Sequence, residues 1–221
     1  MKPSPYQRLL LAFVLLLPST VYAEPKTSQV KAPPSSMQII RRLLGISQRV
    51  AAAGSRSDPL LGVCLITPAL NPAQNDQANT VLLSNPVLVS KEPLNEVQID
   101  LGDQQWRALA SSKKDVGRTV IWPYAPLQGG ETILIRFRSK GSPGGDYSEL
   151  TLIAAPAEVL EQNSTLITRL GSNEKSWINA IESISINNPK LAVALLFSVS
   201  APDTDQIKQM RDLLIENANC D

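Results

Sequence analysis

The stretch ETILIRFRSKGSPGGDYSELTLIA (residues 131–154) sets the fold class of this chain. In its first part the side chains alternate between two faces, and Ile133, Ile135 and Phe137 share the apolar one. A period of two is typical of a strand with one buried face. The glycine-rich segment 139–148 is turn sequence, so residues 149–154 are expected to return as the antiparallel partner of a β-hairpin.

Before this hairpin the chain carries further short apolar runs separated by turn residues. The strand candidates are LLGVCLIT (60–67), NTVLLSNPVLVS (79–90), NEVQIDL (95–101), QQWRALA (104–110) and RTVIWPY (118–124). Pro86 places its run at a sheet edge or a bulge. Short strands at regular spacing favour an antiparallel immunoglobulin-like β-sandwich over residues 58–155, and a small barrel is the alternative.

After the hairpin the apolar period changes from strand to helix. Pro156 suits a first helical position, and Asn188 before Pro189 is a strong helix-start pair. Apolar residues at helical spacing follow within 156–170, 172–184, 187–200 and 203–217. The fold class is therefore α+β, a sandwich followed by a C-terminal α-helical hairpin region over residues 156–221.

The N-terminus has the layout of a cleavable signal peptide. Lys2 and Arg8 precede the apolar run LLLAFVLLL (9–17), and small residues follow at Val21 and Ala23. This pattern predicts a signal peptide over residues 1–23 and export to the periplasm or the extracellular space. An uncleaved anchor is the alternative, but the apolar run is short for a membrane span.

Residues 24–57 form a basic segment in an otherwise acidic chain. Residues 25–57 contain six basic side chains and no acidic one, whereas residues 58–221 contain 13 basic and 19 acidic side chains. A polar spacer precedes MQIIRRLLGISQRVAAAG, whose spacing predicts one amphipathic helix over 37–53. Candidate contacts with an anionic membrane or an acidic protein partner are Arg41, Arg42, Arg49, Ile40 and Leu44. The alternatives are a helix that packs on its own acidic domain and a tethering arm with no fixed position.

The only two cysteines of the chain are Cys64 and Cys220. An even count in an exported protein favours a disulfide between them, which would close most of the mature chain. The alternative is two unpaired thiols, one buried and one at a frayed tail.

No catalytic, cofactor or metal signature stands out. The chain has no histidine, which excludes Ser-His and Cys-His catalysis. Ser-x-x-Lys occurs at Ser111 and at Ser172, without the companion motifs of penicillin-binding enzymes. Asp100 with Asp103, and Asp203 with Asp205, offer too few oxygens for calcium. We therefore expect a protein that is not an enzyme, needs no cofactor or metal, and does not bind nucleic acid.

The residues RVAAAGSRSDPLLGVCLITP (49–68), the Gly129-Gly130 turn before TILIRFR and the helical tail resemble a cyanobacterial family of secreted proteins. This family is the domain of unknown function nine-twenty-eight or a close sister group, and the resemblance covers residues 49–221. It implies an immunoglobulin-like sandwich before a helical tail, and no known chemistry. The chain departs from the family in lacking an aromatic cluster in its second strand and a cysteine within residues 131–138.

Three functional hypotheses follow. The first is an exported protein-interaction or envelope scaffolding module. The second is a small-molecule or glycan-binding module with Trp122 and Tyr124 as a ligand platform, which a concave apolar pocket beside these aromatics would favour. The third is a membrane-surface protein held by its basic helix. The fold class does not choose among them.

Overall fold

The computed structural model describes residues 36–44, 63–69, 79–111, 116–140 and 147–218, together with the backbone of residues 48–50. These residues all belong to one unit of the chain, Pro34–Asp221. The predicted signal peptide and most of the basic segment lie outside the described residues. No helix in the described part is both long and apolar enough to cross a membrane.

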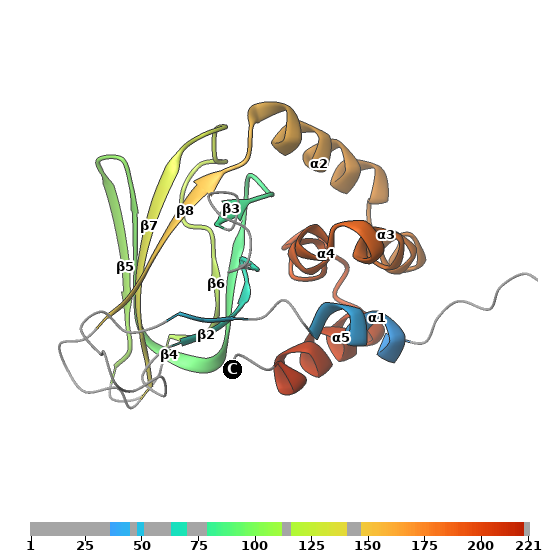
Figure 1. The fold of residues 1–221 in the computed structure, drawn as a ribbon, viewed down its shortest axis with the longest axis horizontal. Coiled ribbons are helices and arrows are strands. Elements are labelled where there is room, and N and C mark those ends of the chain that lie inside the picture. Colours follow the sequence, from blue (N-terminus) through green and yellow to red (C-terminus); the bar gives the residue numbers. More distant parts are fainter. Residues whose placement is uncertain are drawn as a thin grey trace, which may run out of the picture. The chain divides into compact units, whose positions relative to one another are not determined.

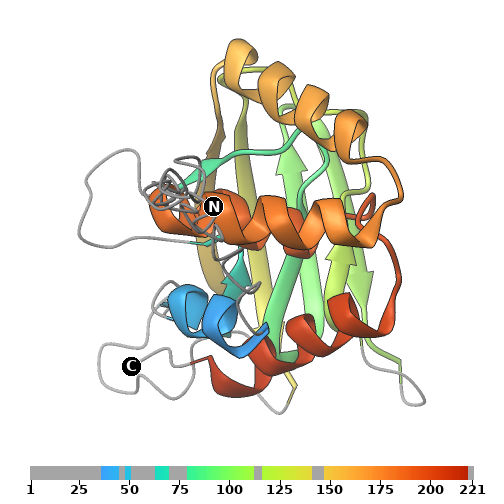
Figure 2. The ribbon, with the colours of Figure 1, turned by 90° about the vertical axis from the view of Figure 1, so that its right-hand side faces the viewer.

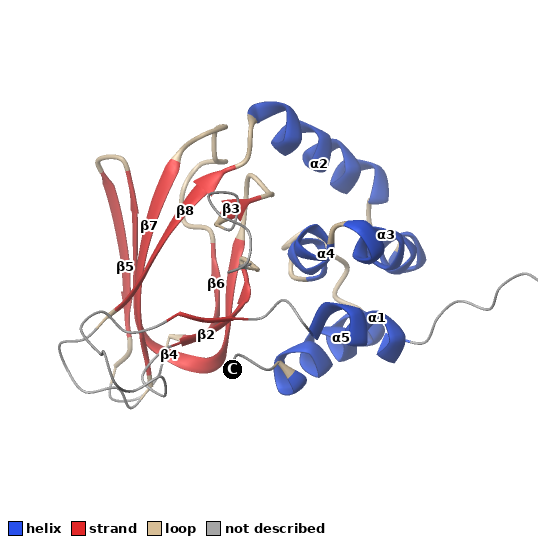
Figure 3. Ribbon diagram, viewed as in Figure 1, coloured by secondary structure: helices blue, strands red, loops and turns tan. Residues whose placement is uncertain are grey.

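The α+β class is confirmed, and the last strand is followed only by helices (Figures 1 and 3). In chain order, the described elements are α1 (Ser36–Leu43), β1 (Gln48–Val50), β2 (Val63–Thr67), β3 (Thr80–Val81), β4 (Val87–Leu101), β5 (Gln104–Leu109), β6 (Gly117–Ile121), β7 (Thr132–Ser139), β8 (Ser148–Ala154), α2 (Ala157–Leu170), α3 (Glu174–Asn187), α4 (Pro189–Leu196) and α5 (Asp205–Asn217).

All described strands form one curled sheet with the long strand β4 at its centre. The strand order is β1-β2-β4-β7-β8-β3, and β5 and β6 also pair with β4. The first part of β4, up to Leu94, pairs with β2 and β6, whereas its second part pairs with β7 from Leu94 and with β5 from Glu96. The predicted hairpin of β7 and β8 is confirmed, with Ile135 opposite Leu150. The sheet curls so far that β1 comes into contact with β8.

The immunoglobulin-like sandwich is not confirmed, because the described strands form one half-barrel instead of two separate sheets. The predicted strand 79–90 is divided between β3 and the start of β4, and its last residues join the predicted strand 95–101 in one continuous strand from Val87 to Leu101. The pairing register of β4 shifts between Val89 and Leu94, where the strand changes partners. The pairing of β3 with β8 is also parallel, which an antiparallel sandwich would not contain.

The sheet has two separate apolar cores, one on each side of β2 and the start of β4. The inner core fills the half-barrel and includes Leu65, Leu88 and Phe137, closed by Leu160 of α2. The outer core lies between the sheet and the helices α1, α3, α4 and α5. Figure 2 shows these helices as a layer in front of the strands. Residues of β2 and early β4 therefore face a core on both sides, which explains their continuous apolar runs.

The prediction of one helix over residues 37–53 is wrong. Helix α1 ends at Leu43, and residues 48–50 form strand β1, in which Arg49 pairs with Cys64. Gly45 has low helical propensity, and strand pairing with β2 outweighs the helical periodicity of the segment. Within α1, the fully buried side chains are Ile39, Ile40 and Leu43, so the helix docks on the outer core.

The C-terminal helices begin close to the predicted positions. Asn188 caps α4, and its Oδ1 accepts a hydrogen bond from the backbone N–H of Leu191 at 3.0 Å. Helix α2 starts at Ala157, one residue later than predicted, so that Pro156 occupies the N-cap position and not the first helical position. Gly129 packs against this helix start so closely that a Cβ at Gly129 would lie 2.4 Å from the Ala157 nitrogen. The Gly129-Gly130 turn therefore has a steric requirement for glycine.

Candidate functional site

An open groove of about 700 Å³ lies where the end of β8 meets the beginnings of α2 and α4. We call it the β8–α4 groove. Its lining residues come from four parts of the chain that are distant in sequence: Thr80, Leu82, Gly130, Ile153, Ala154, Ala155, Pro156, Val159, Asn188 and Lys190. Most of these side chains are apolar, and Ile153 is 43% exposed although it is a large aliphatic residue.

Two contacts fix the strand side of the groove. Strand β3 pairs in parallel with the end of β8, so that Thr80 lies opposite Ile153. The buried side chain of Asn163 on α2 then donates a hydrogen bond from Nδ2 to the carbonyl oxygen of Leu82 at 2.8 Å. Helix α2 and the chain after β3 are therefore held together at the groove wall.

The helix side of the groove is set by the packing of α4. Four α4 residues are fully buried in the outer core, namely Ala192, Val193, Leu195 and Leu196. Lys190 lies at the second position of this helix, and its half-buried side chain lines the groove. Burial lowers the pKa of Lys190, because an ammonium group loses hydration beside apolar walls.

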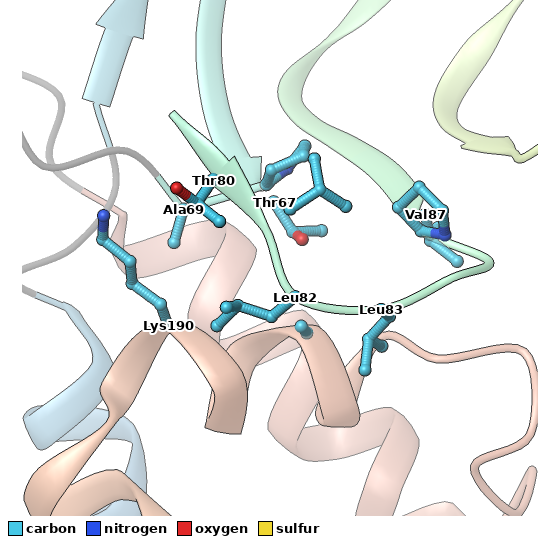
Figure 4. A pocket seen from close by; sticks show the side chains of 11 residues that line it. Thr67, Ala69, Thr80, Leu82, Leu83, Val87 and Lys190 are labelled. Carbon is cyan, nitrogen blue, oxygen red and sulfur yellow. The ribbon is translucent and has the colours of Figure 1, made fainter. Parts of the chain in front are cut away.

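Two narrow crevices lie in the neighbourhood of the groove. The first shares Thr80, Leu82 and Lys190 with it and has a free volume of about 20 Å³, enough for one water molecule. Figure 4 shows Lys190 rising from α4 beside Ala69 and Thr80 in this crevice. The second lies in the half-barrel, shares Pro68 and Pro86 with the first, and has only about 10 Å³ free. The half-barrel is thus filled by its own side chains, and the groove is much wider than either crevice.

The predicted ligand platform lies apart from the groove. Trp122 and Tyr124 follow the end of β6 and contact each other edge-to-face, with ring centroids 5.3 Å apart. The indole N–H of Trp122 donates to the Ala125 carbonyl oxygen at 2.8 Å, and the Tyr124 hydroxyl donates to the Ile99 carbonyl oxygen at 2.6 Å. Burial raises the pKa of Tyr124. Both polar tips are thus engaged in hydrogen bonds that hold the turn after β6, and Trp122 also lines the second crevice.

The candidate membrane or partner contacts differ in how exposed their side chains are. Arg41 and Arg42 are exposed at the end of α1. Ile40, by contrast, is fully buried, and Leu44 is half-buried against the outer core. The apolar face of this helix therefore covers the protein's own core and is not presented to a membrane. Arg49 is described by its backbone in β1 alone.

Cys64 is fully buried in β2 and is not a free thiol. Its backbone N–H donates to Glu92 Oε2 at 3.3 Å, and the neighbouring Lys91 Nζ donates to the Ala218 carbonyl oxygen at 2.7 Å. Residue 218 is therefore held beside the strand that pairs with β2. Cys220 lies outside the described residues, so its disulfide with Cys64 stays a prediction, which this proximity supports.

A buried ionic cluster lies on the polar face of the sheet. Glu96 has no exposed surface, and its carboxylate accepts hydrogen bonds from Arg107, Arg138, Tyr147 and Gln98. Burial acts to raise the pKa of Glu96, but these hydrogen bonds outweigh it and lower the pKa from 4.5 to about 2. The carboxylate is already surrounded by donors from its own chain, so this cluster has a structural role.

No group of three or more metal-ligating side chains gathers in the described part of the chain. Asp100, one of the carboxylates considered for calcium, forms an ion pair with Arg136 at 2.6 Å. A comparison with protein-family models gives no match, and a comparison with curated proteins gives no significant one. The resemblance to the cyanobacterial secreted family therefore stays a prediction.

None of the groove residues was predicted from the sequence as a binding residue, although Gly130, Pro156 and Asn188 were recognised as turn and helix-start residues. Lys190 follows a helix-start pair and reads as a helix surface residue, and Ile153 was expected only as part of a hairpin strand. Asn163 was visible only as a possible modification pattern, Asn-Ser-Thr, on a predicted helix. The parallel pairing of β3 with β8 brings these residues together, and no local sequence pattern encodes that pairing.

Proposed function

We propose that this chain is an exported binding protein without catalytic activity, which holds a small and largely apolar molecule in the β8–α4 groove. The observation that carries the proposal is the groove itself, about 700 Å³ in volume and lined mainly by apolar side chains. Ligand sites commonly measure roughly 300–1,000 Å³ and combine apolar walls with a few polar groups. Thr80, Asn188 and Lys190 supply such polar groups here.

The direct test is a titration with a neutral apolar dye, N-phenylnaphthylamine, whose fluorescence rises in apolar surroundings. We expect saturable binding to the wild-type protein. Ile153→Asp places a charge on the exposed wall of the groove and is expected to weaken binding by about tenfold or more, since one aliphatic contact is worth about 1.5–3 kcal/mol.

Ile186→Asp is the matched control for this experiment. Ile186 is also a solvent-exposed isoleucine, 64% exposed on α3, and it does not line the groove. Its replacement should leave dye binding unchanged. Absence of saturable binding to the wild type, or equal loss in both variants, would overturn the proposal.

A second candidate function is protein interaction along the β5–β6 edge of the sheet. Within the described residues these two strands pair only with β4. Leu109 on β5 and Ile121 on β6 are 58% and 61% exposed, which supports a partner that covers this edge. The test is capture of a protein from an extract of the producing cells by the wild type, and its loss with the double variant Leu109→Lys, Ile121→Lys. Equal capture by both proteins would dismiss this candidate.

A further inference from the structure

Most backbone N–H groups along the β8–α4 groove already donate hydrogen bonds within the chain. The lining residues whose N–H donates to a backbone carbonyl oxygen are Gly130, Ile153, Ala154, Ala155, Val159 and Asn188. Pro156 also lines the groove and has no N–H to offer. The polar contacts of a bound molecule are therefore expected to come mainly from side chains.

The lining residues that the structure describes include three with polar side chains, namely Thr80, Asn188 and Lys190. Lys190 already interacts with another group of the chain, so no contact with a ligand is assigned to it. The hydroxyl group of Thr80 both donates and accepts, and it therefore does not select between donors and acceptors on a ligand. The chemistry of the ligand thus depends most on Asn188.

The carboxamide group of Asn188 is oriented by helix α4. Its Oδ1 accepts a hydrogen bond from the backbone N–H of Leu191 at 3.0 Å, which holds the oxygen at the helix start. Since an amide nitrogen donates and does not accept, Nδ2 is the other arm of this planar group and points away from the helix. In the described part of the chain Nδ2 has no hydrogen-bond partner, and Asn188 is exposed. Asn188 therefore offers the groove a donor and no acceptor.

The other walls of the groove are mainly apolar. Leu82 after β3, Ile153 at the end of β8 and Val159 in α2 come from three different elements, and Ile153 is 43% exposed. A molecule that covers these walls and Asn188 but has no acceptor would remove Nδ2 from water without replacing its hydrogen bond, which lowers affinity. A molecule with an acceptor oxygen beside Nδ2 avoids this loss.

We propose that the ligand of the β8–α4 groove is a neutral carbonyl compound, such as a medium-chain ketone or ester, whose carbonyl oxygen accepts a hydrogen bond from Asn188 Nδ2. Its alkyl part lies against Leu82, Ile153 and Val159. This inference rests on the proposed function and specifies its ligand class. The donor selects a carbonyl oxygen, and the apolar walls supply affinity in proportion to the area that they bury.

The experiment compares 2-octanone with 2-octanol, which share a carbon skeleton and differ in the group that holds the oxygen. Each displaces bound N-phenylnaphthylamine in a titration, which gives its dissociation constant for the wild type and for Asn188→Asp. The new carboxylate keeps the helix cap and presents an acceptor to the groove in place of the donor. The alcohol can donate to this carboxylate, whereas the ketone cannot. We expect the ratio of ketone affinity to alcohol affinity to fall about tenfold in Asn188→Asp.

Asn173→Asp is the matched control for this experiment. Asn173 caps α3 in the same way, since its Oδ1 accepts a hydrogen bond from the backbone N–H of Ser176 at 3.0 Å, and it does not line the groove. This substitution adds the same charge to a helix cap and leaves the groove walls unchanged. The ratio of the two affinities should therefore remain that of the wild type.

The outcomes separate the two proposals. An unchanged ratio in Asn188→Asp, or an equal fall in Asn173→Asp, would overturn the assignment of a carbonyl ligand, while saturable binding of the dye keeps the groove as a binding site. Failure of 2-octanone to displace the bound dye would overturn the assignment in the same way. If the dye does not bind to the wild type, both proposals fail. Saturable binding of the dye to Asn188→Asp checks that its groove is intact, so that a change in the ratio is not loss of fold.

Discussion

The two halves of strand β4 lie in different surroundings although they belong to one strand. In the first half, Val87 and Val89 face the helices and Leu88 faces the half-barrel, so both faces are buried. In the second half, Val97 and Ile99 face the half-barrel, whereas Glu96 belongs to a polar face that the helices do not cover. The sequence shows the same division, VLVS in the first half and NEVQIDL in the second.

The two halves of β4 are buried on both faces by different physical means. Apolar packing alone buries the first half, and it requires a layer on each side. The second half has no such layer on its polar face, and charged side chains bury one another there. Glu96 is fully buried because Arg107 and Arg138 from the neighbouring strands cover it and satisfy its oxygens. The first arrangement tolerates no charge, and the second depends on one.

The largest effect is expected from a charge placed in the first half. Val89→Asp puts a carboxylate among the apolar side chains of the outer core and should cost at least about 5 kcal/mol, comparable to the whole stability of a domain. We expect loss of cooperative unfolding, measured by circular dichroism during a urea titration. Thr119→Asp is the control, because Thr119 lies opposite Val89 on β6 but is exposed. A cooperative transition in Val89→Asp close to that of the control would contradict the assignment of two buried faces.

The second largest effect is expected at the predicted disulfide between Cys64 and Cys220, beside the first half of β4. If Cys64 and Cys220 are joined, the bridge closes most of the described chain, and Cys64→Ser with Cys220→Ser should lower the free energy of unfolding by about 4–5 kcal/mol. Thiol titration of the denatured, unreduced protein measures the bond directly, and reduced wild type should unfold like the double variant. Two titratable thiols in the unreduced protein would refute the bridge.

The sequence was sufficient to predict elements whose pattern is local. The alternation of Ile133, Ile135 and Phe137 identified β7, and Asn188 before Pro189 identified the start of α4. Both depend on neighbouring residues, a pleat in one case and a cap in the other. The α+β class follows from the change of period near Pro156 for the same reason.

Features that depend on distant pairing could not be predicted in this way. The segment after Leu43 has helical periodicity, yet residues 48–50 pair with β2, more than a dozen residues further along the chain. The break expected between residues 90 and 95 is absent because β4 is paired again from Leu94, which lies opposite Gly117 of β6 and Ser139 of β7. The groove depends on β3, a two-residue strand whose parallel pairing with β8 has no sequence signature.

Removal of the charge in the second half should have a smaller effect than the first two changes. Glu96→Gln leaves Arg107 and Arg138 without a carboxylate and should destabilise the protein by about 3 kcal/mol, the range for breaking one side of a buried ion pair. Glu149→Gln is the control, because its pair with Arg136 is half-exposed and should be worth less than about 1 kcal/mol. Urea unfolding near neutral pH measures both. If the two variants are equally stable, the ionic cluster around Glu96 does not stabilise the polar face of the sheet.

The smallest effect is expected from pH. Protonation of Glu96 removes the charge of this side chain without a substitution, so the free energy of unfolding should depend on pH. The pKa of Glu96 is about 2 in the folded protein and near 4.5 in an ordinary environment, so between these values the unfolded chain binds more protons than the folded one. The contribution of Glu96 to the free energy of unfolding is therefore fully present well above pH 4.5. It decreases as the pH falls, by about 2 kcal/mol at about pH 3. The measurement is the urea midpoint as a function of pH in the wild type and in Glu96→Gln. Other carboxylates change both proteins alike, so the difference between the two midpoints should shrink toward low pH. A constant difference would mean that Glu96 acts through shape and hydrogen bonds alone, and the second half of β4 would then resemble the first more than its sequence suggests.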